Sequence, residues 1–268
     1  MNCFAKIVLL LIATWLPTTA SADEVGDGAN LSLDEVLACM SANSPQEALV
    51  QVVELVTVDR TGSERTQTGK LAVKRFPEGG RMLLRVEAPP DLRGTAFLLI
   101  QKEDRSDMFT YLPALQKVRR ITSQTLRGRL LGTDFTYEEI EQMLAMSRAN
   151  HPVLEGPGSA AGRPTWTLRT TPSPDSGSSY SKIVTQVDQE TCIPIVIDFY
   201  EAGAEPAKTL TADPDRITQE VGGVHVARLL EMEDRKRGTR SRIVTHSVEI
   251  DPELRDRDFT QSRLARGR

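Results

Sequence analysis

The first half of the chain alternates apolar and polar residues in short runs separated by turn-forming residues. Met82, Leu84 and Val86, for example, share one face of a run whose other face carries Arg85 and Glu87. This alternation predicts β-strands, because successive side chains of a strand point to opposite faces. Connections of a few residues predict antiparallel pairing. The strands expected in this half are 49–59, 66–76, 81–88, 95–102, 108–112 and 117–121.

The second half continues in the same style, and the whole chain is expected to hold about ten antiparallel strands. Residues 95–102 are apolar on both faces, which predicts a central strand covered on both sides. Residues 156–164, rich in Gly, Pro and Ala, and the polar residues 172–179 are expected to be loops. The further predicted strands are 165–171, 183–187, 193–200, 208–210, 224–232 and 240–250.

Two segments have helical rather than strand periodicity. Residues 31–40 begin with Ser32 and Glu35 at the spacing of a capping box. Residues 136–147 place an apolar stripe on one face, and Asp134 is expected to cap this second helix. The apolar stripes of both helices must be buried, and the concave face of a curved sheet is the natural place. The predicted fold is mainly β with α, a curved antiparallel half-barrel sheet with helices covering its concave face.

The N-terminus has the order of a secretory signal peptide: Lys6, a short apolar run over 7–15, and small residues before a cleavage site after Ala22. We therefore expect an exported chain with a signal peptide at 1–22 and a single domain over 23–268. Cys39 and Cys192 then remain, and they either form a disulfide or are two buried thiols, since spacing in sequence does not fix their geometry.

Composition and motifs argue against several functions. The net charge is −4, which disfavours nucleic acid as the main partner. The sequence contains no HExxH, CxxC, GxSxG or phosphate-binding glycine loop. His151, His225 and His246 are widely separated, and no further residue suggests a shared metal. We therefore predict no catalytic residues, no metal and no cofactor, and a hydrolase is a distant alternative.

A basic run between residues 117 and 129 has three interpretations. It carries five basic residues without an acid or an aromatic: Lys117, Arg119, Arg120, Arg127 and Arg129. Nucleic-acid binding fits poorly with the absence of aromatic residues. Contact with phospholipid headgroups or a partner is physically reasonable, because each base near an anionic surface contributes about 1 kcal/mol. The third interpretation is the solvated edge of a sheet, where basic residues discourage edge pairing.

Two motifs carry a resemblance to a known family. Tyr-Leu-Pro at 111–113 precedes Lys-Val-Arg-Arg-Ile at 117–121, and Gly-Thr-Asp-Phe-Thr-Tyr-Glu-Glu-Ile follows at 132–140. The chain resembles LolA-like outer membrane lipoprotein-sorting proteins, in the uncharacterised branch related to a treponemal lipoprotein. That branch has serine where this chain has Thr133 and aspartate where it has Glu139. The resemblance extends from about residue 31 to 264.

The resemblance implies a half-open β-barrel whose helices close over an apolar cavity. It implies a monomeric periplasmic carrier that binds lipid or lipoprotein acyl chains and transfers them between membranes, with an inner-membrane exporter as a candidate partner. The alternative is an accessory protein that docks on an exporter of the resistance-nodulation-division type and carries nothing itself. Neither the cargo nor the donor and acceptor partners follow from the sequence.

The apolar faces supply the predicted cavity lining. Each of these residues could equally be core, and a strand shifted by one residue would invert its faces. The expected ligand-binding residues are Met82, Leu84, Val86, Phe97, Leu99, Met108, Trp166, Tyr137, Ile140 and Leu144. The expected headgroup or partner contacts are Lys117, Arg119 and Arg120.

Overall fold

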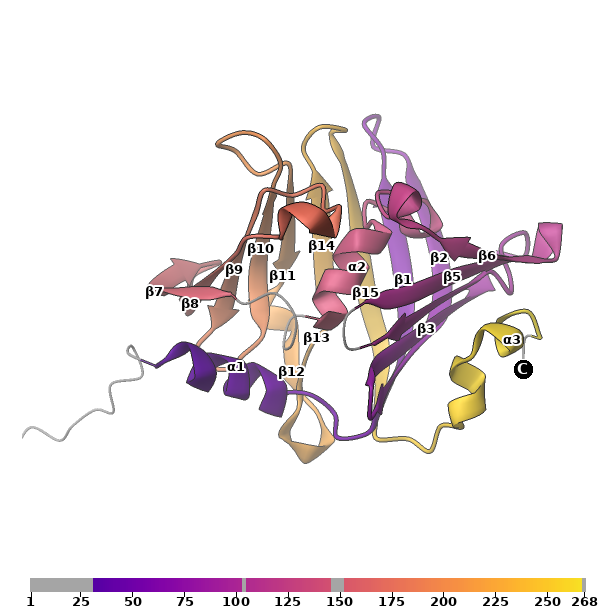
Figure 1. Cartoon of the computed structure of the whole chain (residues 1–268), viewed down its shortest axis with the longest axis horizontal. Coiled ribbons are helices and arrows are strands. Elements are labelled where there is room, and N and C mark those ends of the chain that lie inside the picture. Colours follow the sequence, from indigo (N-terminus) through magenta and orange to yellow (C-terminus); the bar gives the residue numbers. More distant parts are fainter. Residues whose placement is uncertain (1–30, 103–104, 146–151, 267–268) are drawn as a thin grey trace, which may run out of the picture.

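A computed structural model describes residues 31–102, 105–145 and 152–266 of the chain. One curved sheet of 13 strands dominates it, in the order β6-β5-β4-β3-β2-β1-β15-β14-β11-β10-β9-β8-β7 (Figure 1). Neighbouring strands pair antiparallel throughout. The strands are β1 (Ala48–Val58), β2 (Glu64–Phe76), β3 (Gly79–Ala88), β4 (Ala96–Gln101), β5 (Ser106–Leu112), β6 (Lys117–Ile121), β7 (Val153–Ala160), β8 (Arg163–Thr170), β9 (Lys182–Asp188), β10 (Pro194–Tyr200), β11 (Lys208–Ala212), β14 (Leu229–Asp234) and β15 (Thr239–Ile250).

The topology divides the sheet into two limbs that meet in the middle. Strands β1 to β6 follow one another as a meander and form the first limb. Strands β7 to β11 and β14 form the second, and β15 joins the limbs by pairing with β1 on one side and β14 on the other. A small pair, β12 (Ile217–Gln219) and β13 (His225–Ala227), stands apart from the large sheet. The predicted fold class, a large curved antiparallel sheet with few helices, is confirmed.

Two sequence-based predictions about strands are wrong. The expected loop at 156–164 instead holds the second part of β7, the turn after it and the first residues of β8. Pro157 is tolerated there because β7 is the last strand of the sheet, where a missing N–H costs no ladder bond. The single strand expected at 224–232 is divided into β13, which pairs with β12, and β14, which pairs with β11 and β15.

Both predicted helices lie on the concave side of the sheet. Helix α1 (Leu33–Ala42) is capped by Ser32, and the expected capping box with Glu35 is present. Helix α2 (Tyr137–Ala145) lies between the two limbs (Figure 1). The side chain of Val36 on α1 packs with Trp166 and Val187, which places α1 over the second limb. The helices therefore cover the face that their apolar stripes predicted.

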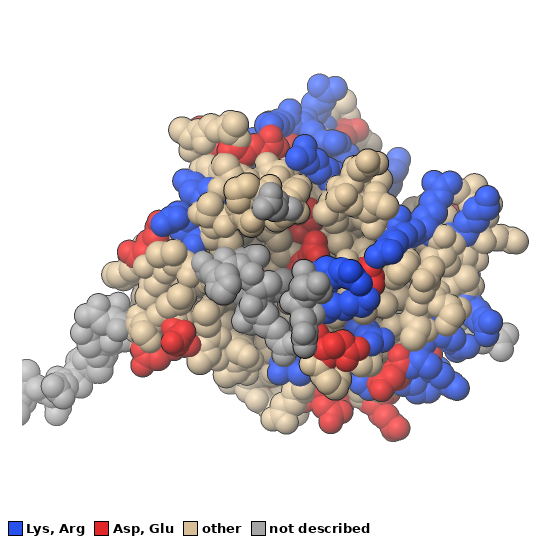
Figure 2. All heavy atoms as spheres, viewed as in Figure 1, with Lys and Arg blue, Asp and Glu red and all other residues tan. Residues whose placement is uncertain are grey.

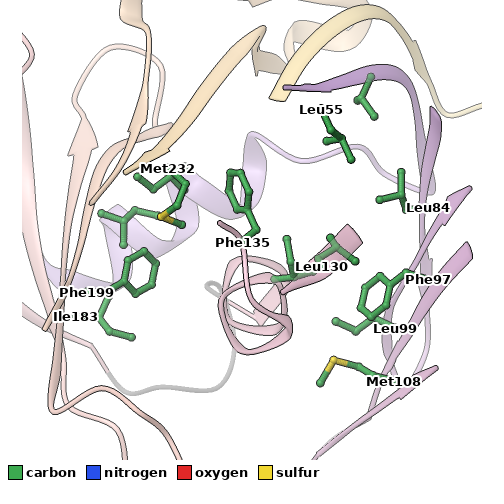
Figure 3. Close-up of a cluster of buried hydrophobic side chains, with 14 of the residues drawn as sticks. Leu55, Leu84, Phe97, Leu99, Met108, Leu130, Phe135, Ile183, Phe199 and Met232 are labelled. Carbon is green, nitrogen blue, oxygen red and sulfur yellow. The ribbon is translucent and has the colours of Figure 1, made fainter. Parts of the chain in front are cut away.

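The main core lies between the limbs, around Phe135 and Leu130 from the segment that leads into α2 (Figure 3). The first limb contributes residues such as Phe97 and the second contributes residues such as Phe199, and both of these side chains are almost fully buried. The segment before α2 thus fills the concave face as well as entering the helix.

The convex face of the first limb has a cover of its own. Phe259, in a 3₁₀ turn over Asp256–Phe259, and Leu264, in α3 (Gln261–Leu264), pack against Leu98 of β4. Since Phe97 and Leu99 face α2 on the other side, β4 is covered on both faces as its sequence predicted. The expected signal peptide at 1–22 lies outside the described residues. No helix within the ranges described is long and apolar enough to cross a membrane.

Candidate functional site: the covered concave face

Asp134 is a buried anchor rather than the predicted helix cap. Its carboxylate accepts hydrogen bonds from Thr239 Oγ1 at 2.7 Å and Ser241 Oγ at 2.7 Å, both on β15, and from Arg129 Nη2 at 2.9 Å. Its side chain is 0% exposed. The prediction failed because the cap of α2 is Thr136, two residues later, whose Oγ1 accepts the Glu139 N–H. Gly132 suits this motif because its φ of +78° is left-handed.

Glu139 carries a second buried charge, on α2. Lys208 Nζ of β11 lies 2.9 Å from Glu139 Oε1 and also donates to the Asp134 carbonyl oxygen at 2.7 Å. The Tyr180 hydroxyl donates to the same Glu139 oxygen. Burial and then the nearby Glu139 charge raise the pKa of Tyr180, so the hydroxyl keeps the proton that it donates. A full set of partners satisfies the buried carboxylate.

The neighbouring Glu138 ties α2 to the segment before β9. Its carboxylate accepts hydrogen bonds from the backbone N–H and the hydroxyl of Ser179, and from the Ser178 hydroxyl. Together with Lys208 and Tyr180, these contacts attach the first turns of α2 to the second limb of the sheet.

Helix α1 is attached to the same limb at its C-terminal end. A disulfide joins Cys39 to Cys192, in the turn between β9 and β10, and settles the question that spacing left open. Asn43, just after the helix, accepts the backbone N–H of His225 on Oδ1 at 2.6 Å. A covalent bond and a short hydrogen bond thus fix the end of α1 at two points.

The turn that carries Cys192 is organised by Asp188. Its buried carboxylate accepts hydrogen bonds from Arg163 Nε and Nη2, each at 3.1 Å, and from the Thr191 N–H and hydroxyl. Burial alone raises the pKa of Asp188, but these hydrogen bonds and the Arg163 charge outweigh it, so the net shift is downward. The charged carboxylate is therefore part of what holds the disulfide-bearing turn.

A cavity of about 440 Å³ remains between the two helix ends and the sheet. This is within the range of roughly 300–1,000 Å³ that ligand pockets occupy. Polar groups at its wall include Asn43, Gln51, Arg75 and Gln101. Its apolar wall comes from both helices and both limbs, with Met40, Leu49, Val73, Met143, Leu144, Ile197, Leu210, Val226 and Leu230. The arrangement can enclose an apolar chain and leave a polar group at the opening.

The ten predicted cavity residues lie in several places. Leu144 lines the cavity. Val86 is buried in β3, and Trp166 packs under α1. The remaining seven belong to the core around α2: Met82, Leu84, Phe97, Leu99, Met108, Tyr137 and Ile140. Strand alternation identified the concave face, but it carried no signal for where that face is filled and where a space remains.

The predicted headgroup contacts lie on β6, the edge strand of the first limb. Basic side chains gather on this side of the molecule (Figure 2). Lys117 and Arg119 are exposed, while Arg120 pairs with Asp107 of β5. The basic run is therefore not one site, because its last member, Arg129, turns inward to Asp134.

The chain is similar to several known proteins. A family model described as "-like: Uncharacterized protein" matches residues 78–266. No curated protein matches the chain. A crystal structure described as an outer membrane lipoprotein-sorting protein domain, from Vibrio parahaemolyticus, is 23% identical, with a TM-score of 0.76 over 86% of this chain and 97% of that one.

Two further crystal structures have the same fold. A DUF1329 family protein from Desulfovibrio piger is 22% identical, with a TM-score of 0.78 over 86% of this chain and 96% of that one. A LolA superfamily protein from Nitrosomonas europaea is 19% identical, with a TM-score of 0.66 over 86% of this chain and 98% of that one.

Proposed function

Since the chain belongs to the uncharacterized family whose model it matches and has the fold of LolA-like lipoprotein-sorting proteins, we propose that it is a periplasmic carrier of acyl chains. It takes up lipid or lipoprotein acyl chains from one membrane and delivers them to another. The observation that carries this proposal is the partly apolar cavity between α1, α2 and the concave face of the sheet.

The energetics of such a carrier need no catalytic group. Burying a methylene group contributes about 0.8 kcal/mol, so a chain of several methylene groups is held by its apolar surface alone. Release then requires a conformational change or a partner that lowers the affinity. Both helices are attached at defined points, which leaves the rest of each helix to adjust to cargo.

The exposed bases of β6 supply a contact for an anionic surface. Lys117 and Arg119 stand at the sheet edge without burial, and bases at such a position attract anionic headgroups or an acidic partner protein. We assign them to the step in which the carrier meets its donor or acceptor, not to retention of the chain.

The first experiment is to purify the protein from cells, extract it with organic solvent and identify lipids by mass spectrometry. We expect acylated molecules in stoichiometric amount, and a fluorescent fatty acid should bind the stripped protein. Absence of both co-purifying lipid and probe binding would refute the carrier function.

A charge-reversal variant separates retention from transfer. Lys117→Glu with Arg119→Glu is expected to slow transfer of a labelled acyl chain to vesicles containing anionic lipid while probe affinity stays unchanged. The matched control reverses Arg60, which is exposed on the β1–β2 turn and away from β6. Equal transfer rates in both variants would show that the basic edge is solvated surface.

A further inference from the structure

We infer that the acyl chain of the cargo runs past Met40 of α1 into a second, smaller pocket over β8 and β9, and that Met40 is a movable partition within one longer binding site. The inference rests on the proposed function and deepens it, because it assigns the path of the chain and a residue that sets the preference between long and short chains. It follows from the walls of the two spaces and from the register of the strands beneath them.

The second pocket lies on the same concave face as the main cavity. Its volume is about 30 Å³, and among the described residues Met40 alone lines both spaces. The rest of its wall comes from two strands of the second limb and from α2, and it includes Leu168, Thr170, Ile183, Thr185 and Gln142. The Met40 side chain therefore stands between two spaces that the same helices cover.

The strand register shows how close the two spaces are. Ile197 of β10 lines the main cavity, and its antiparallel partner on β9, Thr185, lines the second pocket. Neighbouring strands of a sheet lie about 4.8 Å apart. On α2, the consecutive residues Gln142 and Met143 line the second pocket and the main cavity respectively. The two spaces are therefore immediate neighbours, and Met40 occupies their boundary.

Methionine suits a partition that moves. Its side chain is unbranched and flexible, and its polarizable thioether packs well in more than one orientation. The backbone beside it is held, because the preceding residue, Cys39, is bonded to Cys192. The boundary can therefore open by rotation of the Met40 side chain, without displacement of α1.

Polar groups give the chain a direction. Arg75 of β2 and Gln101 of β4 are at the wall of the main cavity on the first limb, and Arg75 is exposed. The second pocket lies on the second limb, where Leu168 and Ile183 supply apolar surface. A chain with a polar head therefore keeps its head near the first limb, in contact with water, and places its methyl end beyond Met40.

Position-specific quenching tests this path. Trp15→Phe in the full chain leaves Trp166 as the single tryptophan, since the sequence contains two. Trp166 lies on the same face of β8 as Leu168, two residues before it and so about 7 Å away along the strand. We expect bound stearate with bromine near its methyl end to quench Trp166 fluorescence, because bromine quenches indole at short range. Stearate with bromine beside its carboxylate should leave the fluorescence nearly unchanged.

The outcomes separate this inference from the proposed function. Equal quenching by the two brominated acids, or stronger quenching from the carboxylate end, would overturn the assigned path and leave the carrier function standing. Binding of both acids without quenching would do the same. Failure of stearate to bind at all would overturn both.

Filling the second pocket should affect long chains selectively. Thr170→Phe on β8 is expected to lower stearate affinity by about fourfold for each methylene group that it excludes, and to leave decanoate affinity unchanged. Thr171→Phe makes the same substitution at the exposed next position, outside both walls, and should alter neither affinity. Thr185→Leu is a smaller filler if Thr170→Phe does not fold. Unaltered stearate affinity in a folded filled variant would place the chain elsewhere.

Met40→Ala tests the partition itself. We expect the ratio of stearate affinity to decanoate affinity to rise by at least about fourfold, equivalent to one further buried methylene group, because the long chain no longer has to displace a side chain. Leu37→Ala shortens a side chain of the same helix outside both walls and should leave the ratio unchanged. An unchanged ratio in folded Met40→Ala protein would show that Met40 is a fixed wall.

Discussion

The two helices on the concave face are held in different ways. Two buried carboxylates fix helix α2 and the segment before it. Asp134 binds Ser241 of β15, and Glu139 pairs with Lys208 of β11. Helix α1 is fixed near its end by the Cys39–Cys192 disulfide and by Asn43. Around the start of α2 the core is tightly filled, whereas a cavity remains between the ends of the two helices.

The difference follows from what each kind of attachment requires. Buried charges need complete sets of partners and a dry, well-packed surrounding, so the region around Asp134 and Glu139 is rigid and carries no space for cargo. A disulfide needs no such surrounding, since its strength is covalent. It can hold α1 as one wall of a cavity whose other wall is apolar and unfilled.

The largest loss of unfolding free energy is expected from removing Asp134, which anchors the segment before α2. Asp134→Ala removes the carboxylate to which Arg129 Nη2 and Ser241 Oγ donate, and breaking such a buried pair costs about 3–5 kcal/mol. Urea unfolding measures the loss. Glu190→Gln, an exposed carboxylate that pairs with Arg163, is the control and should change stability by less than about 1 kcal/mol. Equal losses would mean that Asp134 is not an anchor.

Removing the disulfide that anchors α1 should lower the free energy of unfolding by somewhat less. Cys39→Ser with Cys192→Ser is expected to lower the free energy of unfolding by about 2–4 kcal/mol, because the unfolded chain is no longer constrained. The same variant should release bound acyl probe faster, since one cavity wall is loosened. Wild-type protein under a dithiol reductant should match it. Unchanged probe release in the folded variant would separate the disulfide from cargo retention.

Lowering the pH should reduce the stability of the turn that holds α1, because Asp188 in that turn becomes protonated. Because its folded pKa lies below the unfolded value, near 3.9, its contribution to stability is present above that value and is lost as pH falls through the folded pKa. Asp188→Asn should therefore lose stability at neutral pH, by on the order of 1–3 kcal/mol, and show a shallower decline below about pH 4. Thermal unfolding across pH measures this; parallel wild-type and variant profiles would contradict it.

The smallest losses of stability are expected from removing the N-caps of the two helices. Thr136→Ala removes the buried cap of α2 and Ser32→Ala the exposed cap of α1, each of which accepts a backbone N–H at 3.4 Å. Cap removal costs about 0.5–2 kcal/mol, and we expect the buried site near the upper end and the exposed site near the lower. Circular dichroism with urea resolves this difference. A larger loss of unfolding free energy in Ser32→Ala than in Thr136→Ala would contradict this expectation.

Local sequence patterns were sufficient to predict most of the strands and both helices of the concave face. The period-two alternation of β3 and the two apolar faces of β4 predicted a strand and its coverage correctly, because side-chain direction along a strand is a local property. The Ser32–Glu35 spacing located the start of α1 for the same reason. The hairpin of β7 was missed because Gly and Pro dominate its sequence, and its position at the sheet edge is not a local property.

Contacts between distant segments were decided by the tertiary structure. Asp134 looked like a cap because Asp near a helix start usually is one, but Ser241 and Thr239, more than 100 positions away, draw its side chain inward. Pairing of Cys39 with Cys192 and the empty space beside Met40 likewise depend on how α1 sits on the second limb. The sequence by itself determined a curved antiparallel sheet with two covering helices. Where the concave face is filled and where it stays open follows from packing, which no single segment encodes.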